Sequence, residues 1–471
     1  MSIINSSSFI TDDFLLESEI AKTLFFEYAL NMPIIDYHNH LSAKQIAENE
    51  PLKNITDTWL SEDHYKWRGM RANGIDEEFI TGNASKQKKF QKWADTVPYT
   101  VRNPLFHWTQ LELKRYFNID EILQPSNADK IYHQTNQILE TKTPTDLLDL
   151  MKVEVVCTTD DPLDDLKYHA IIAQKEYNTK VYPTFRPDNF FLIGQGNFIG
   201  YIEKLKEMIP FEITNFETFV KAIDLRIDFF DKHGCKLSDF GISGKNEFIE
   251  FTNAEVDIIF QKGIKEANIS EIEVSKYRSA LFLHLGKKYH EKGWVQQYHL
   301  GPIRNNNSRL LKLVGADAGC DSIGDYSFAE FMSTLFNKLD ATDQLAKTIT
   351  YNLNPAHNEV FATMMGNFNT GKVPGKMQWG AAWWFLDQKD GIESQLNILS
   401  NIGLLSRFIG MLTDSRSLLS FPRHEYFRRI LCNLLANDIE KGLIPNDIEF
   451  IGKLVQDICY NNAKAYFNFD N

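Results

Sequence analysis

Short runs of apolar and β-branched residues recur along the chain, and segments with apolar residues at helical spacing separate most of them. Segment 271–291 is of the helical kind, because Val274, Tyr277 and Leu281 recur at helical spacing and Gly293 would end the helix. The short runs are 33–37, 153–158, 181–185, 235–240, 294–299, 348–353, 377–383 and 408–413. Strands that alternate with helices predict an α/β fold with a parallel sheet, and eight such units predict a closed (β/α)8 barrel of the TIM type.

A doubly wound open sheet is the alternative to the barrel. Such a sheet usually carries a glycine-rich turn for a nucleotide after its first strand. The turn that follows the first predicted strand reads HNHLSAK and contains no glycine. The barrel is therefore the favoured fold.

The predicted strands are unevenly spaced at one place, where residues 38–152 separate the first two runs. This stretch carries helical patterns and many aromatic residues, such as Trp59, Tyr65 and Trp93. The loop after the first strand of a barrel opens at the catalytic face. We therefore expect a barrel made of residues 1–44 and 151–471, with a mostly helical insertion, 45–150, that caps the barrel mouth. A separate helical domain is the alternative.

Composition limits the partners and the compartment. The chain has 471 residues, 43% of them hydrophobic, and a formal net charge of −13, so it should repel nucleic acid and anionic membranes. The five cysteines show no CxxC spacing and indicate reduced thiols. Neither a signal peptide nor a long apolar segment is apparent. These features predict a cytoplasmic protein that acts on a small molecule, and assembly into a homo-oligomer stays open.

The sequence DYHNH, which begins at Asp36, places two histidines at the end of the first predicted strand. His38 and His40 are two residues apart, so their side chains leave a strand on the same face and can bind one metal through imidazole nitrogen. Other strand ends carry Asp239, His299 and Asp414. In a barrel these ends converge, so His38, His40, His299 and Asp414 should surround one divalent ion. Zinc suits these ligands, with manganese or iron as alternatives.

Three arginines follow the same strand ends, namely Arg186, Arg304 and Arg416. Guanidinium groups match carboxylates through paired hydrogen bonds, so several of them beside one metal suit a small polyhydroxylated acid. The alternative is that some of these arginines pair with nearby carboxylates of the protein, which are Asp188, Asp239 and Asp317.

Motif stretches along most of the chain resemble those of uronate isomerase (glucuronate isomerase), a divergent family of the amidohydrolase superfamily. They are DYHNHL from Asp36, HYKWRGMRANG from His64, NPLFHWTQLEL from Asn103, TFRPD from Thr184, QYHLGPIRNNNSR from Gln297, DSIGD from Asp321, WGAAWWF from Trp379 and MLTDSRSLLSFPRHEYFRRILC from Met411. The resemblance implies a distorted barrel and an aldose–ketose isomerase. The implied reactions interconvert D-glucuronate with D-fructuronate and D-galacturonate with D-tagaturonate.

Two departures from related sequences affect the expected site. Hydrolases of the superfamily usually place a metal-bridging lysine on the fourth strand, where this chain has Asp239, so a site with one metal fits better than a site with two. Within the isomerase family a histidine often follows that aspartate, and Phe240 stands there instead.

An aldose–ketose isomerase moves a proton between adjacent carbons through an enediol, and this step needs a base and stabilised oxygens. We expect Asp414 to carry the carbon-bound proton, an assignment that the resemblance also implies. Arg416 and Tyr65 would serve the substrate oxygens, and His299 would complete the metal shell or donate to the substrate. The expected substrate-binding residues are Arg186, Arg304 and Asp239. A mononuclear metal-dependent hydrolase and a non-catalytic sugar-acid binding protein are the alternatives.

Overall fold

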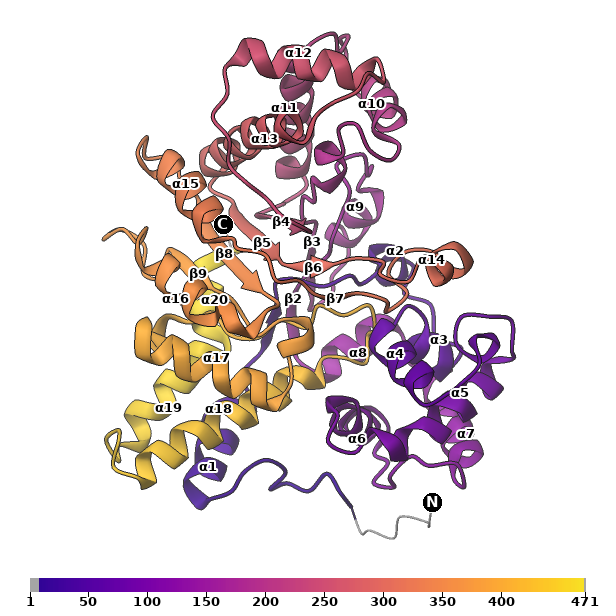
Figure 1. The fold of residues 1–471 in the computed structure, drawn as a ribbon. Helices are drawn as coiled ribbons and strands as arrows, with labels where there is room; N and C mark the ends of the chain where they lie inside the picture. Colours follow the sequence, from indigo (N-terminus) through magenta and orange to yellow (C-terminus); the bar gives the residue numbers. More distant parts are fainter. Residues whose placement is uncertain (1–7, 470–471) are drawn as a thin grey trace.

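The structure is a computed structural model that describes residues 8–469, and its central feature is a set of parallel strands in two sheets (Figure 1). One sheet has the order β1-β2-β3 and the other the order β4-β5-β8-β9. The strands are β1 (Ile34–Asp36), β2 (Val153–Cys157), β3 (Lys180–Tyr182), β4 (Leu237–Ile242), β5 (Val295–Leu300), β8 (Lys347–Asn352) and β9 (Met377–Trp379). Each overlaps a predicted run, so the prediction of an α/β fold with parallel strands is confirmed.

The two sheets approach each other beside Phe185, which forms isolated parallel bridges with Asp160 on one side and Ser238 on the other. The outer strands of the two sheets, away from Phe185, are β1 and β9. An eighth strand was predicted over 408–413, but this segment is not a strand, so that prediction was wrong. Gly410 explains the difference, because its φ of +78° interrupts an extended backbone. The strand pairings within residues 8–469 consequently form two parallel sheets and do not close into a barrel.

A third sheet, an antiparallel pair of short strands, was not predicted. It joins β6 (Pro302–Ile303) to β7 (Ser322–Ile323), and α14 (Ser308–Val314) lies between them in the sequence. Each of these strands is only two residues long, which is too short for an alternating pattern to show.

Helices flank the strands and bury the core. They are α9 (Lys167–Ala173), α10 (Phe198–Glu207), α11 (Phe216–Lys232), α12 (Asn253–Ile264), α13 (Glu271–Lys292), α15 (Ala329–Asp340), α16 (Asn358–Gly366), α17 (Lys389–Ile402), α18 (Pro422–Glu440), α19 (Ile448–Gln456) and α20 (Asn462–Phe467). The helix predicted over 271–291 is confirmed as α13. A reciprocal cap between Ser270 and Glu273 begins it, and Gly293, with a φ of +70°, ends it.

Helices also fill the long interval between β1 and β2. They are α2 (Ala43–Glu48), α3 (Ile55–Leu60), α4 (His64–Ala72), α5 (Lys86–Thr96), α6 (Pro104–Phe117), α7 (Ala128–Leu139) and α8 (Pro144–Leu150), whereas α1 (Glu19–Thr23) precedes β1. Figure 1 shows α3 to α7 gathered on one side of the strands. Arg68 of α4 donates to the carbonyl oxygen of Asp321 at 2.8 Å, so this helical group is tied to the segment between α14 and β7.

Two further sequence-based expectations concern thiols and membranes. All five cysteines are free thiols, and Cys157, Cys235 and Cys432 are buried. Among residues 8–469, no helix combines the length and the apolar character needed to cross a bilayer.

Gly410 provides a test of the interrupted strand. Alanine at this position would have to hold a positive φ, and its Cβ would collide with the carbonyl oxygen of Ile458. We expect Gly410→Ala to lower the free energy of unfolding by about 2–4 kcal/mol, measured by urea denaturation. Gly442 is the matched control, because its φ is +71° but nothing lies within 4 Å of an added Cβ. Gly442→Ala should cost about 1 kcal/mol, and equal losses would contradict the account.

Candidate active site

A cavity of about 730 Å³ opens beside the carboxyl ends of the strands. Seven of the residues predicted to form the site line it, namely His38, His40, Arg186, His299, Arg304, Asp414 and Arg416. Asp239 is completely buried and contacts Arg186 and His299 of this group. The structure therefore brings together residues that lie far apart in the sequence.

Asp414 joins the two histidines that follow β1. Its Oδ1 atom lies 3.1 Å from Nε2 of His38 and 3.1 Å from Nε2 of His40. Its other oxygen, Oδ2, accepts a hydrogen bond of 2.7 Å from the indole N–H of Trp383. Burial alone would raise the pKa of Asp414, but the two imidazoles outweigh it and hold that pKa well below its usual range. Asp414 is therefore ionised at neutral pH.

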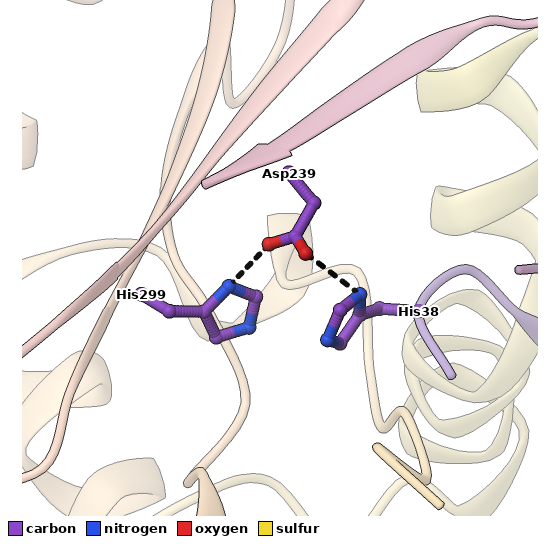
Figure 2. Close-up of side chains that lie close together, drawn as sticks. All are labelled: His38, Asp239 and His299. Carbon is purple, nitrogen blue, oxygen red and sulfur yellow. Dashed lines mark ion pairs between the residues drawn. The ribbon is translucent and has the colours of Figure 1, made fainter. Parts of the chain in front are cut away.

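A second group of side chains meets around Asp239 (Figure 2). The Oδ1 atom of Asp239 lies 2.6 Å from Nδ1 of His299, and its Oδ2 atom lies 3.8 Å from Nδ1 of His38. Arg186 reaches the same Oδ2 atom with Nη1 at 3.1 Å. Burial opposes the charge on Asp239, but Arg186 and the two imidazoles outweigh it and lower the pKa of Asp239 far below its usual value.

The site fits a metal ion. Two sets of potential ligands share His38, one with His40 and Asp414 and the other with Asp239 and His299, and within each set the ligand atoms lie within 4.8 Å of one another. Nδ1 of His38 and Nε2 of His299 are buried without a hydrogen-bond partner. Buried polar atoms normally have partners, so these atoms point to a ligand that completes the site. Imidazole with carboxylate suits zinc, manganese or iron.

The three predicted arginines differ in what they contact. Arg186 donates from Nε to Asp188 at 2.9 Å and also pairs with Asp239. Arg304 lies 3.1 Å from Asp321 and 3.6 Å from Asp317, and its guanidinium stacks 4.8 Å above the ring of Trp384. The expectation that some arginines pair with protein carboxylates is thus confirmed. Arg416 forms no ion pair with any of residues 8–469 and remains available to an anion.

Tyr65 does not line the main cavity. Its hydroxyl donates to Oδ2 of Asp387 at 2.9 Å, and its ring faces an adjoining cavity of about 300 Å³. The preceding residue, His64, lines both cavities. Both residues belong to α4, where successive side chains point about 100° apart, so only one of them can face the main cavity. In this structure Tyr65 is held by Asp387 outside the main cavity, and its role at the substrate oxygens stays a prediction.

His64 and Arg278 are among the residues of the cavity wall that could not be recognised from the sequence. His64 was overlooked beside Tyr65, and Arg278 lies in the helical pattern of α13, where a charged residue usually faces solvent. The indole of Trp383, which lies in the WGAAWWF motif, donates to Asp414. Phe240, which stands where relatives often have histidine, packs 4.3 Å from the ring of Phe191 and makes this part of the wall apolar.

Comparison with known proteins identifies the family. The family model for glucuronate isomerase matches residues 6–467 of the chain. The chain belongs to the glucuronate isomerase family. The resemblance seen in the motifs, and the isomerase activity inferred from it, are therefore confirmed, and the hydrolase alternative is not favoured.

Relatives of this isomerase match over their whole length. The chain is 52% identical to the uronate isomerase of Flavobacterium johnsoniae, an alignment that covers 99% of this chain and 100% of the relative. It is 47% identical to the uronate isomerase of Cellvibrio japonicus, with 98% and 99% covered. The crystal structure of uronate isomerase from Thermotoga maritima superposes with a TM-score of 0.93 at 33% identity, covering 98% of this chain and 100% of that one.

Asp387, the partner of Tyr65, should make the stability of the isomerase depend on pH. Burial raises the pKa of Asp387 from 3.8 to about 7, although Arg423 and Tyr65 oppose the rise. Between pH 4 and pH 7 the folded chain therefore holds a proton that the unfolded chain releases, so the free energy of unfolding falls as the pH rises. We expect Asp387→Asn to remove this fall and to be more stable than the unchanged protein at pH 8, by up to about 4 kcal/mol.

Urea denaturation at pH 5 and at pH 8 measures the effect. Asp438→Asn serves as the control, because Asp438 is only partly buried and lies on α18 away from the cavity-lining residues. An Asp387→Asn variant with the same pH dependence as the unchanged protein would contradict the assignment.

Proposed function

We propose that this isomerase interconverts D-glucuronate with D-fructuronate, and D-galacturonate with D-tagaturonate, by proton transfer through an enediol beside one divalent metal ion. The observation that carries the proposal is the contact of one ionised carboxylate, Asp414, with two imidazoles in a cavity lined by arginines. A sugar acid needs both features, because its carboxylate requires cationic partners and its carbon-bound proton requires a base.

Asp414 is proposed as the base that carries the proton between the two carbons. It is ionised, and it stands at the cavity wall with one face toward the imidazoles. One carboxylate on one side of the substrate can take the proton from the first carbon and return it to the second. Arg416 has no ion-pair partner among the described residues and is proposed to stabilise the negative charge that develops on the enediol oxygens.

The metal is proposed to be held by His38, His40 and Asp414, with zinc favoured and manganese or iron as alternatives. When bound, the ion supplies positive charge next to the substrate oxygens. His299 either completes the metal shell or donates a hydrogen bond to the substrate. Its Nδ1 atom lies 2.6 Å from Asp239, so the imidazole is held in place for either role.

Arg186, Arg304 and Asp239 are proposed to bind the distal carboxylate and the hydroxyls of the substrate. A guanidinium has five N–H donors, so Arg186 and Arg304 keep donors free while they pair with protein carboxylates. Asp239 is fully buried, and its part in binding is to hold Arg186 and His299 in place. A direct role for Tyr65 at the substrate oxygens would require it to leave Asp387.

We also propose that the strands belong to a distorted (β/α)8 barrel. It was predicted over residues 1–44 and 151–471, of which 1–7 and 470–471 lie outside the described residues. The bridges at Phe185 support contact at one junction of the two sheets. At the other junction Asp414 donates its N–H to the carbonyl of His38 at 3.2 Å, and His40 donates to Ser415 at 2.9 Å. Residues 45–150 are proposed to cap the barrel mouth, because His64 of α4 lines the cavity.

The free thiols support a reducing, cytoplasmic compartment.

The activity is tested with purified protein and D-glucuronate, by following the appearance of D-fructuronate. Asp414→Asn preserves size and removes the base, so turnover should fall by about 10²–10⁴-fold. Asp438→Asn is the control and should keep full activity. Metal content must be measured on the same samples, and an Asp414→Asn variant that retains both its metal and nearly full activity would place the base elsewhere.

The metal assignment has a separate test. Elemental analysis of the purified protein should find about one divalent ion per chain, since one pair of histidines and one carboxylate make one site. Replacing both His38 and His40 by alanine should abolish that ion. Two tightly bound ions, or none after supplementation, would contradict a site with one metal.

A further inference from the structure

A buried carboxylate outside the cavity connects the two segments that carry the proposed metal ligands. Asp36 is the last residue of β1, is fully buried and does not line the cavity. Its Oδ1 atom accepts the backbone N–H of Thr413 at 2.7 Å, and its Oδ2 atom accepts the hydroxyl of Thr413 at 2.6 Å. Thr413 is thus held by both its backbone and its side chain.

Two more donors complete the shell around Asp36. The side-chain amide of Asn39 donates to Oδ2 at 2.8 Å, and Nε2 of His424, on α18, lies 3.3 Å from Oδ1. Burial lowers the pKa of His424, so it donates to Asp36 as a neutral imidazole. A carboxylate offers about four lone-pair sites, and the four donors occupy all of them. Asp36 therefore has no free position for a metal or a substrate.

The position of Asp36 in the sequence gives these contacts their importance. Asp36 precedes His38 by two residues, and Thr413 directly precedes Asp414. The contact between Asp36 and Thr413 thus fixes the two segments against each other, two residues before His38 and one residue before Asp414.

Asp414 needs such support, because its φ of +46° lies in the left-handed region that costs energy for a residue with a Cβ. A strained conformation persists only where the surroundings hold it. The two hydrogen bonds from Thr413 to Asp36 fix the residue that directly precedes Asp414. The N–H of Asp414 itself donates to the carbonyl oxygen of His38.

We propose that Asp36 is a positioning residue that holds Asp414 in register with His38 and His40 and thereby sets the metal affinity of the site. The inference rests on the metal ligands proposed above. Asp36 acts through Thr413 and is not itself a ligand. Asparagine cannot replace it, since its amide has one acceptor oxygen and would turn an N–H group toward donors that Asp36 now accepts.

The test compares metal affinity with folding. Zinc dissociation constants are measured by competition with a chromophoric chelator, and thermal unfolding is measured on the metal-free proteins. We expect Asp36→Asn to weaken zinc binding by about 10–100-fold and to lower kcat more than it changes KM. Tyr116→Phe is the matched control, because it removes a buried hydroxyl that donates to the carbonyl of Leu418 at 2.9 Å, five residues beyond Thr413. It should lower the melting temperature and leave zinc affinity unchanged.

A second pair of variants keeps the proposal testable if Asp36→Asn does not fold. Thr413→Val loses the hydroxyl that Asp36 accepts and should weaken zinc binding, whereas Thr413→Ser keeps the hydroxyl and should bind zinc as the unchanged protein does. Equal zinc affinity in Thr413→Val and Thr413→Ser, or in Asp36→Asn and the unchanged protein, would overturn the positioning role alone. An unchanged protein that binds no zinc, manganese or iron would overturn the metal assignment as well.

Discussion

The carboxylate of Asp414, shared by the Nε2 atoms of His38 and His40 at 3.1 Å each, is the interaction on which the site depends. Removing a carboxylate from water is expensive unless charge or hydrogen bonds replace the lost solvent. The fold supplies these through the histidines after β1 and the indole of Trp383. A divalent ion among these groups would compensate the same charge more completely.

The charge balance around the cavity accounts for its preference for acids. The chain as a whole carries a formal charge of −13, which would repel an anionic sugar at long range. Within the cavity, Arg186 and Arg304 are already paired with protein carboxylates, whereas Arg416 has no such partner among the described residues. Local cationic groups act over a few ångströms, where screening by salt is weak, so they can decide which substrate enters.

Much of the fold and most of the cavity wall could be predicted from the sequence, because strand ends in a parallel sheet converge whatever their separation along the chain. Periodicity placed seven strands correctly but could not show that Gly410 takes a positive φ, because the carbonyl oxygen of Ile458, which leaves no room for a Cβ at Gly410, lies far from it in the sequence. The choice between His64 and Tyr65 depends on how α4 is rotated, and short motifs do not record this rotation. Arg278 could not be found from the sequence either, because its place in the cavity wall depends on how α13 is rotated.

We propose that one metal ion binds between His38, His40 and Asp414. Crystals grown with zinc, with anomalous diffraction recorded at the zinc edge, test it most directly. We expect one anomalous peak per chain, at about 2.0–2.2 Å from Nε2 of both histidines and from a carboxylate oxygen of Asp414. A peak bonded instead to Asp239 and His299 without His40, or two peaks per chain, would contradict it.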